Sequence, residues 1–215
     1  MFQGVGEIGR RLGTALALAA MLALPATAKA PVQPVTYDNP ARILKVFPAD
    51  VGPVADGVRL RLSNGDWTEV VGNAFGEAPP VICWYAPALH VAGVCQDAPG
   101  VTLTILIDLR SGRRVSAPGR ASLTSERALI AIGPGGPHHA PSDSVTLVRV
   151  TSTGLIEEGG AEFGDDYQPG GWIDARCYRL KAKGAGPDGW LEKTSEGWRQ
   201  VAAAQSQVCQ RRHGG

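Results

Sequence analysis

The sequence predicts an all-β protein built from about four repeats of roughly 44 residues. The chain has 28 Gly and 16 Pro among 215 residues, and they fall between short apolar runs, a composition typical of turn-rich β-proteins. Four segments share one pattern, in which an extended run, a Ser- or Thr-bearing turn with a late Gly, and a second run follow one another: 60–67, 107–114, 148–155 and 191–198.

The chain begins with the layout of a secretory signal peptide, which we assign to residues 1–30. A basic start is followed by an apolar stretch too short for a comfortable membrane crossing, and then by small residues that fit cleavage after either Ala28 or Ala30. Arg10 and Arg11 fit ordinary export as well as the twin-arginine route for folded proteins. We therefore expect a periplasmic or secreted protein with no membrane span after cleavage.

Removal of the signal peptide takes away three basic residues and one acidic residue, so the net charge changes from +1 to about −1. A chain of this charge lacks the basic excess that favours nucleic acid or an anionic membrane surface. We expect residues 31–41, which are rich in proline, to form an extended lead-in. Residues 42–215 are long enough for a single β-rich domain with its own core.

The four cysteines of an exported chain predict two disulfides. We favour Cys83–Cys95, because the two residues flank a plausible hairpin at residues 87–90. The second pairing, Cys177–Cys209, would tie the C-terminal tail to the last apolar strand. Zinc binding is disfavoured, because the chain has no Cys-x-x-Cys spacing.

Strand candidates lie between the four turns, where apolar residues alternate or run together. Residues 102–107 are apolar enough for a strand that is covered on both faces. Near the C-terminus, residues 200–212 are rich in Ala and Gln and favour a short terminal helix. The predicted strands are 81–85, 90–95, 101–109, 128–132, 144–150, 172–181 and 190–193.

The spacing of the turns suggests a specific all-β architecture. The late glycines Gly65, Gly112, Gly154 and Gly197 lie 47, 42 and 43 residues apart, which is the period of β-propeller blades. The segment 107–115, with Asp108, Ser111 and Gly112, resembles the strand–turn–strand of quinoprotein-like propeller repeats. This resemblance implies a small β-propeller-like fold and carries no cofactor residues. An irregular β-sandwich or meander is the alternative.

Two loops carry side chains that bear on metal binding or catalysis. His138 and His139 are imidazoles in a Gly- and Pro-rich loop, but adjacent side chains diverge on an extended backbone, so an exposed polar loop is favoured. Asp165 and Asp166 are paired carboxylates that suit calcium or acid–base chemistry. Their spacing does not match a calcium loop, and we favour a solvated turn.

The sequence contains none of the common catalytic or phosphate-binding motifs, so it assigns no catalytic residue, cofactor or metal. It favours a soluble exported binding or interaction module over an enzyme. The expected partner is a protein or small-molecule ligand in the cell envelope. The alternative is a periplasmic hydrolase that uses the Asp165/Asp166 loop, with or without a metal.

Overall fold

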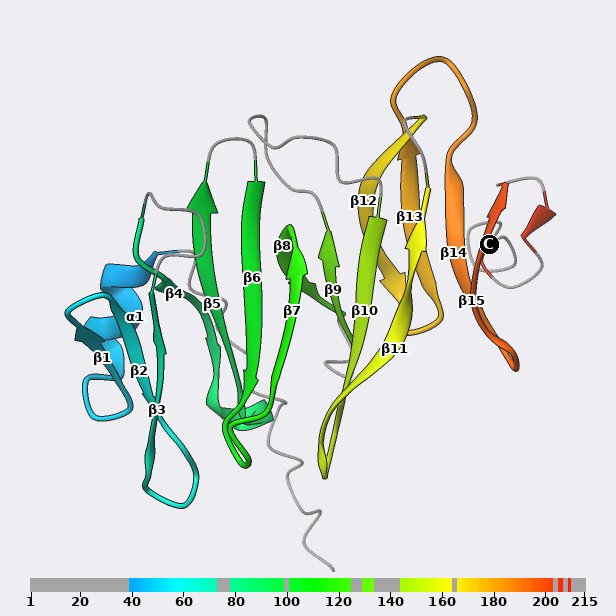
Figure 1. Ribbon diagram of the computed structural model, residues 1–215. Helices are drawn as coiled ribbons and strands as arrows, with labels where there is room; N and C mark the ends of the chain where they lie inside the picture. Colours follow the sequence, from blue (N-terminus) through cyan, green and yellow to red (C-terminus); the bar gives the residue numbers. More distant parts are fainter. Residues whose placement is uncertain are drawn as a thin grey trace, which may run out of the picture. The chain divides into compact units, whose positions relative to one another are not determined.

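Four antiparallel sheets, each made of strands that are consecutive in the chain, form the fold (Figure 1). The computed structural model describes residues 39–72, 78–98, 101–124, 129–133, 144–163, 166–202, 205, 206 and 209. These residues belong to the unit Pro34–Gly215, and the predicted signal peptide lies outside them. The all-β prediction is confirmed, since the described residues hold fifteen strands and a single short α-helix.

A short helix precedes the first sheet, where the sequence predicts an extended lead-in up to residue 41. Asn39 caps this helix, since its side-chain Oδ1 accepts hydrogen bonds from the backbone N–H groups of Ala41 at 3.0 Å and Arg42 at 3.4 Å. Pro40 occupies the first helical turn, where its missing N–H costs nothing. The helix and the three strands of the first sheet are α1 (Pro40–Val46), β1 (Val51–Val54), β2 (Gly57–Arg61) and β3 (Trp67–Val71).

The second and third sheets have four strands each. In the second sheet, the short 3-10 helix η1 (Pro87–Leu89) joins the first two strands, which are followed by two more: β4 (Val81–Ala86), β5 (Val91–Ala98), β6 (Val101–Asp108) and β7 (Arg114–Pro118). The strands of the third sheet are β8 (Arg120–Leu123), β9 (Leu129–Gly133), β10 (Ser144–Thr151) and β11 (Gly154–Glu162).

The fourth sheet corrects two predictions. The predicted strand 172–181 is two strands, because the chain turns at residues 175 and 176 between them. The predicted helix cannot begin at residue 200, because residues 200–202 belong to the last strand; most of the remaining tail lies outside the described residues. The strands are β12 (Tyr167–Asp174), β13 (Cys177–Ala182), β14 (Gly189–Thr194) and β15 (Gly197–Ala202).

The core consists of layers of apolar side chains between consecutive sheets. One cluster joins α1 and the first sheet to the second, another joins the second to the third, and another joins the third to the fourth. In β6, Ile107 packs toward the first sheet and Leu106 toward the third, so this strand is covered on both faces as its sequence predicts. Among the described residues, no such cluster joins the fourth sheet to the first.

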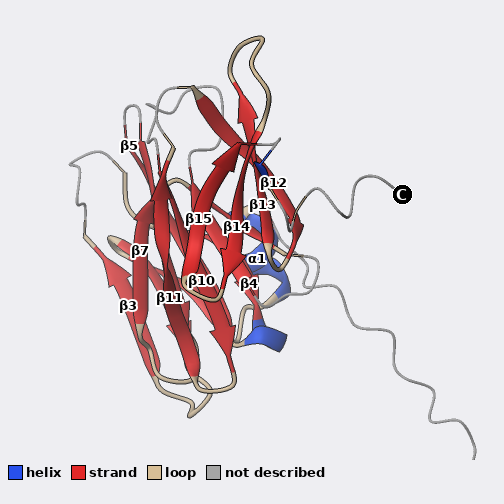
Figure 2. Cartoon of the chain, turned by 90° about the vertical axis from the view of Figure 1, so that its right-hand side faces the viewer, coloured by secondary structure: helices blue, strands red, loops and turns tan. Residues whose placement is uncertain are grey.

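The predicted turns join the last two strands of each sheet. Figure 1 shows these hairpins, β2–β3, β6–β7, β10–β11 and β14–β15, at the lower end of the view. Each contains its late glycine with a positive φ, between 74° at Gly112 and 141° at Gly154. In Figure 2, β3, β7 and β11 lie on the opposite flank from α1 and β12.

Asp108 links the hairpins of the second and third sheets. Its fully buried carboxylate accepts hydrogen bonds from Ser111 Oγ at 2.6 Å and Arg110 Nε at 2.8 Å. Arg110 extends further and donates to the backbone carbonyls of Thr151 and Ser152, both at 2.8 Å, in the β10–β11 hairpin. Burial alone would raise the pKa of Asp108, but the bonds from Ser111 and Arg110 outweigh it and lower the pKa.

Glu158 makes the corresponding link between the third and fourth sheets. Its carboxylate pairs with Arg149 on β10, and it accepts hydrogen bonds from Lys193 Nζ at 2.6 Å and Trp198 Nε1 at 3.0 Å in the fourth sheet. Burial would raise the pKa of Glu158, but the hydrogen bonds from Arg149, Lys193 and Trp198 lower it to about 2. One carboxylate thus holds side chains from two sheets together.

Both disulfides join the cysteines that the sequence pairs. Cys83–Cys95 crosses β4 and β5, and Cys177–Cys209 ties the C-terminal segment to β13. Cys177 and Cys209 pack with Trp190 on the face of the fourth sheet that points away from the third. Two disulfides fit an oxidising compartment. The helices of the described part of the chain are too short and too polar to cross a membrane.

Candidate ligand-binding site

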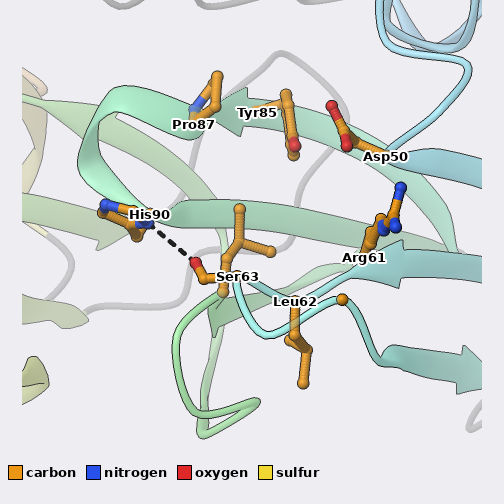
Figure 3. Close-up of a pocket in the computed structure, with 9 residues that line it drawn as sticks. Asp50, Arg61, Leu62, Ser63, Tyr85, Pro87 and His90 are labelled. Atoms are coloured by element: carbon orange, nitrogen blue, oxygen red, sulfur yellow. Dashed lines mark hydrogen bonds between the residues drawn. The ribbon is translucent and has the colours of Figure 1, made fainter.

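An open cavity of about 370 Å³ lies between the first and second sheets, at the end that carries the late hairpins. Its walls come from four separate segments: the loop before β1, the β2–β3 turn, the β4–η1–β5 connection and the end of β6. The cavity is lined by Asp50, Arg61, Leu62, Ser63, Gly65, Tyr85, Pro87, His90 and Leu109 (Figure 3).

A chain of backbone hydrogen bonds fixes the walls of the cavity relative to one another. The N–H of His90 donates to the carbonyl of Pro87 at 2.9 Å, and the carbonyl of His90 accepts from the N–H of Leu109 at 2.7 Å. The carbonyl of Leu109 accepts from the N–H of Ser63 at 2.7 Å. The β2–β3 turn of the first sheet is thereby bonded to the second sheet, so the site has a rigid frame.

Tyr85 places its hydroxyl group in this cavity. Only 3% of the residue is exposed, and its ring packs against Phe47 with the two centroids 4.7 Å apart. Among the described residues, none forms a hydrogen bond with the Tyr85 hydroxyl. Burial, together with the negative charge of Asp50, raises the pKa of Tyr85 to about 12, so the hydroxyl keeps its proton and remains a donor.

Asp50 and Arg61 add opposite charges at the same end of the cavity (Figure 3). The two residues are neighbours through the backbone, because the N–H of Arg61 donates to the carbonyl of Asp50 at 2.8 Å. Yet no ion pair joins their side chains, and neither charged group bonds to another described residue. Asp50 is half-buried and Arg61 is exposed, so both charged groups are open to a ligand.

Ser63 and His90 form a hydrogen-bonded pair at the other end of the cavity (Figure 3). The Ser63 Oγ lies 3.1 Å from the His90 Nδ1, and both residues are exposed. His90 has a φ of 55°, and it is the single non-glycine residue with a positive φ among those described. Histidine is one of the few side chains that adopt this conformation with some frequency, here to end the 3-10 helix at Leu89.

Of the side chains that the sequence singled out for metal binding or catalysis, Asp166 is the one that the structure describes, and it does not line this cavity. His138, His139 and Asp165 lie outside the described residues. Asp166 is exposed in the turn before β12, where its carbonyl accepts a hydrogen bond from the N–H of Lys183 at 2.9 Å. Within the described ranges, no group of three or more His, Cys, Asp or Glu side chains is placed to share a metal ion.

Comparison of this chain with protein-family models, curated proteins and solved structures finds no match. The candidate site is therefore defined by the geometry of its own residues. Sequence reasoning missed it, because Asp50, Arg61, Tyr85 and His90 form no local motif. The sequence signals near the site, the turns at residues 60–67 and 107–114 and the hairpin at 87–90, indicate strand connections and carry no sign of binding.

Proposed function

We propose that this chain is an exported binding module that takes a small polar ligand in the cavity between its first and second sheets. The observation that carries the proposal is Tyr85, which is 3% exposed and lines the cavity with a hydroxyl that bonds to no other residue of the described ranges. The cavity is open, so the hydroxyl is available to donate a hydrogen bond to an acceptor atom of a ligand.

The composition of the cavity supports binding as well. Pockets of a few hundred Å³ that combine apolar walls with a few convergent polar groups are typical small-molecule sites. Here Leu62, Pro87 and Leu109 supply the apolar walls, while Asp50 and Arg61 supply charge. The backbone bonds between Ser63, Leu109 and His90 prearrange the site, so little ordering is needed on binding.

A ligand-observed NMR screen of a fragment library against the processed protein tests this proposal. We expect hits that are weakened about tenfold by Tyr85→Phe, which keeps the ring on Phe47 and removes one hydrogen bond. Tyr167→Phe is the matched control, because Tyr167 lies in β12 outside the cavity. Hits that bind both variants alike, or a screen without hits, contradict a binding site in this cavity.

We also propose a periplasmic or secreted location. Support comes from the signal-peptide layout of residues 1–30 and from two disulfides, which persist in oxidising compartments. Mass spectrometry of the protein recovered from the periplasm or medium gives the mature N-terminus. A chain that begins directly after Ala28 or Ala30 is the expected result, and a full-length cytoplasmic chain would contradict it.

For the architecture, we propose that the four sheets are blades of a small propeller-like fold. Support comes from the consecutive strand order of each sheet and from the equivalent late hairpins with positive-φ glycines. A closed ring requires the first sheet to pack on the fourth. The double variant Trp67→Cys on β3 and Arg199→Cys on β15 tests closure. Crosslinking of the two cysteines supports a closed ring, and the absence of a crosslink supports an open stack of sheets.

A hydrolase is the second candidate function, and the Ser63–His90 pair favours it. A nucleophile within hydrogen-bonding distance of a base is a signature of covalent catalysis. The Ser63 oxygen would attack an ester carbonyl, His90 would take the proton and return it to the leaving alcohol, and water would release the acid. Release of nitrophenol from a short-chain nitrophenyl ester is the assay. Turnover that Ser63→Ala abolishes supports this function, and equal rates exclude it.

The acidic loop offers another route to hydrolysis, with Asp165 and Asp166 as acid, base or metal ligands. Its support is the pairing of the two carboxylates in the sequence and the exposure of Asp166. Elemental analysis of protein purified without chelator tests the metal-dependent version. Stoichiometric metal that is lost in Asp166→Ala supports it, and metal-free protein excludes it.

A further inference from the structure

The two unpaired charges at one end of the cavity identify the class of ligand. Resting on the proposed binding function, we propose that the ligand is a small zwitterion, an α-amino acid with an apolar side chain. Its carboxylate would bind the Arg61 guanidinium, and its ammonium group would bind the Asp50 carboxylate. The Tyr85 hydroxyl would donate to the ligand carboxylate.

The placement of Asp50 and Arg61 argues for opposite charges that lie close together in the ligand. Asp50 directly precedes β1, and Arg61 ends β2, the strand that pairs with β1. Side chains that lie across from one another at such a position are neighbours, and opposite charges there normally attract. Here the backbone bond of 2.8 Å between the two residues sets that arrangement, but no ion pair closes it. A compact zwitterion would supply the missing partner for each charge at once.

Ligands with one charge fit the same end of the cavity less well. A carboxylate without an ammonium group would bind Arg61 but would lie near the uncompensated negative charge of Asp50. An amine without a carboxylate would meet the reverse problem at Arg61. Each single-charge ligand would leave one of the two protein charges without a partner, whereas a zwitterion would form a charge-assisted hydrogen bond with both.

The remaining walls of the cavity argue for an apolar side chain on the ligand. Leu62 and Leu109 come from different sheets and line the cavity together with Pro87. Leu109 is buried at 4% exposure, so it offers a fixed apolar surface. A cavity of about 370 Å³ exceeds the volume of a single amino acid, which leaves room for a branched aliphatic side chain.

Three ligands of matched shape test the inference by isothermal titration calorimetry: leucine, isocaproate, which lacks the amino group, and isoamylamine, which lacks the carboxylate. We expect leucine to bind at least about tenfold more tightly than either single-charge ligand, because each lost charge-assisted contact weakens binding by roughly that factor. Equal or tighter binding of isocaproate or isoamylamine would overturn the zwitterion assignment.

Two variants with matched controls assign the two charges. In Arg61→Gln, we expect leucine to bind no more tightly than isoamylamine. In Asp50→Asn, we expect leucine to bind no more tightly than isocaproate. Arg59→Gln is the control for the first variant, because Arg59 lies on the same strand with its guanidinium 4.6 Å from the Trp67 ring centroid. Asp56→Asn in the β1–β2 turn is the control for the second, since Asp56 is exposed. Controls that change binding as much as the cavity variants would overturn the assignment.

The outcome separates this inference from the proposed function. If the NMR screen gives hits that depend on Tyr85 but leucine shows no advantage over its two analogues, the cavity binds ligands of another class and only the zwitterion inference fails. If no hit depends on Tyr85, the binding function itself fails. Thermal denaturation of each variant, with a melting temperature near that of the wild type, ensures that lost binding is not lost folding.

Discussion

Glu158 shows how much a single side chain contributes where two sheets meet. Its carboxylate interacts with Arg149 in the third sheet and with Lys193 and Trp198 in the fourth. The side chain is only 13% exposed, so these interactions are little screened by solvent. The lowered pKa of Glu158, about 2, reflects that the folded state prefers its charged form.

We predict that Glu158→Gln lowers the free energy of unfolding by about 3 kcal/mol near neutral pH. Because the folded pKa of about 2 lies below the ordinary value of 4.5, the stabilisation is complete above 4.5 and is lost as the pH falls toward 2. Urea denaturation over this range should show wild type and variant converging in acid. Glu157→Gln, an exposed neighbour, is the control, and a gap that does not depend on pH would contradict the prediction.

Residues of the candidate site were beyond prediction for a physical reason. Asp50 and Arg61 come together through one backbone bond, whereas Tyr85 and His90 arrive from another sheet. In the sequence, Tyr85 looks like an ordinary residue of an apolar strand. Only the fold shows that no other described residue forms a hydrogen bond with its hydroxyl. Of the two loops that the sequence did single out, the described residue Asp166 does not line this cavity, whereas His139 and Asp165 lie outside the described residues.

At the scale of elements, Gly119 controls the passage from the second sheet to the third. It is the single residue between β7 and β8, and its φ is 111°. A Cβ added there would lie 2.1 Å from the carbonyl oxygen of Gly133 on the neighbouring strand. The backbone of β9 at Gly133 therefore lies too close for any side chain at position 119.

We predict that Gly119→Ala destabilises the protein by about 3 kcal/mol or more, because the backbone must shift in addition to adopting a strained φ. Gly159→Ala is the matched control, since its φ is 118° but a Cβ there would meet nothing within 4 Å. The control should lose only about 1–2 kcal/mol. Chemical denaturation measures both, and equal losses would show that the contact with Gly133 is unimportant.

The elements that the sequence predicted well are the four late hairpins. Their turn residues form hydrogen bonds with their own backbone, and glycine is required where φ is positive. The turn pattern is therefore set by local sequence and depends little on the rest of the fold. The helix α1 was missed although Asn39 and Pro40 form a helix-start signal. Its β-branched residues Ile43 and Val46 obscured that signal, and burial of Ile43 against the first two sheets stabilises the helix instead.

Two errors near the C-terminus have a common cause. The run 172–181 contains no Gly, Pro or Asn to mark a turn, so its composition does not reveal the turn at Arg176, whose N–H donates to Asp174 Oδ1 at 2.7 Å. The Ala- and Gln-rich segment from Gln200 suggests a helix by propensity. Pairing of β15 with β14, where Gln200 lies opposite Leu191, overrides that propensity.

At the scale of the whole molecule, the two disulfides close loops of different length, with sequence separations of 12 and 32 residues. We predict that Cys177→Ser with Cys209→Ser costs about 4 kcal/mol and that Cys83→Ser with Cys95→Ser costs about 3 kcal/mol, because the longer loop restricts the unfolded chain more. Guanidinium denaturation of both double variants checks the order. A larger loss for the shorter loop would contradict it.

Consecutive strand order has a consequence for the sequence of events in folding. Every strand pairs with a neighbour in sequence, and each cluster of the core joins sheets that follow one another in the chain. The sheets can therefore form one after another along the chain, each on the one before it. The bond between Cys177 and Cys209 can close only when residue 209 is in place after the last strand, and it then covers the face of the fourth sheet that points away from the third.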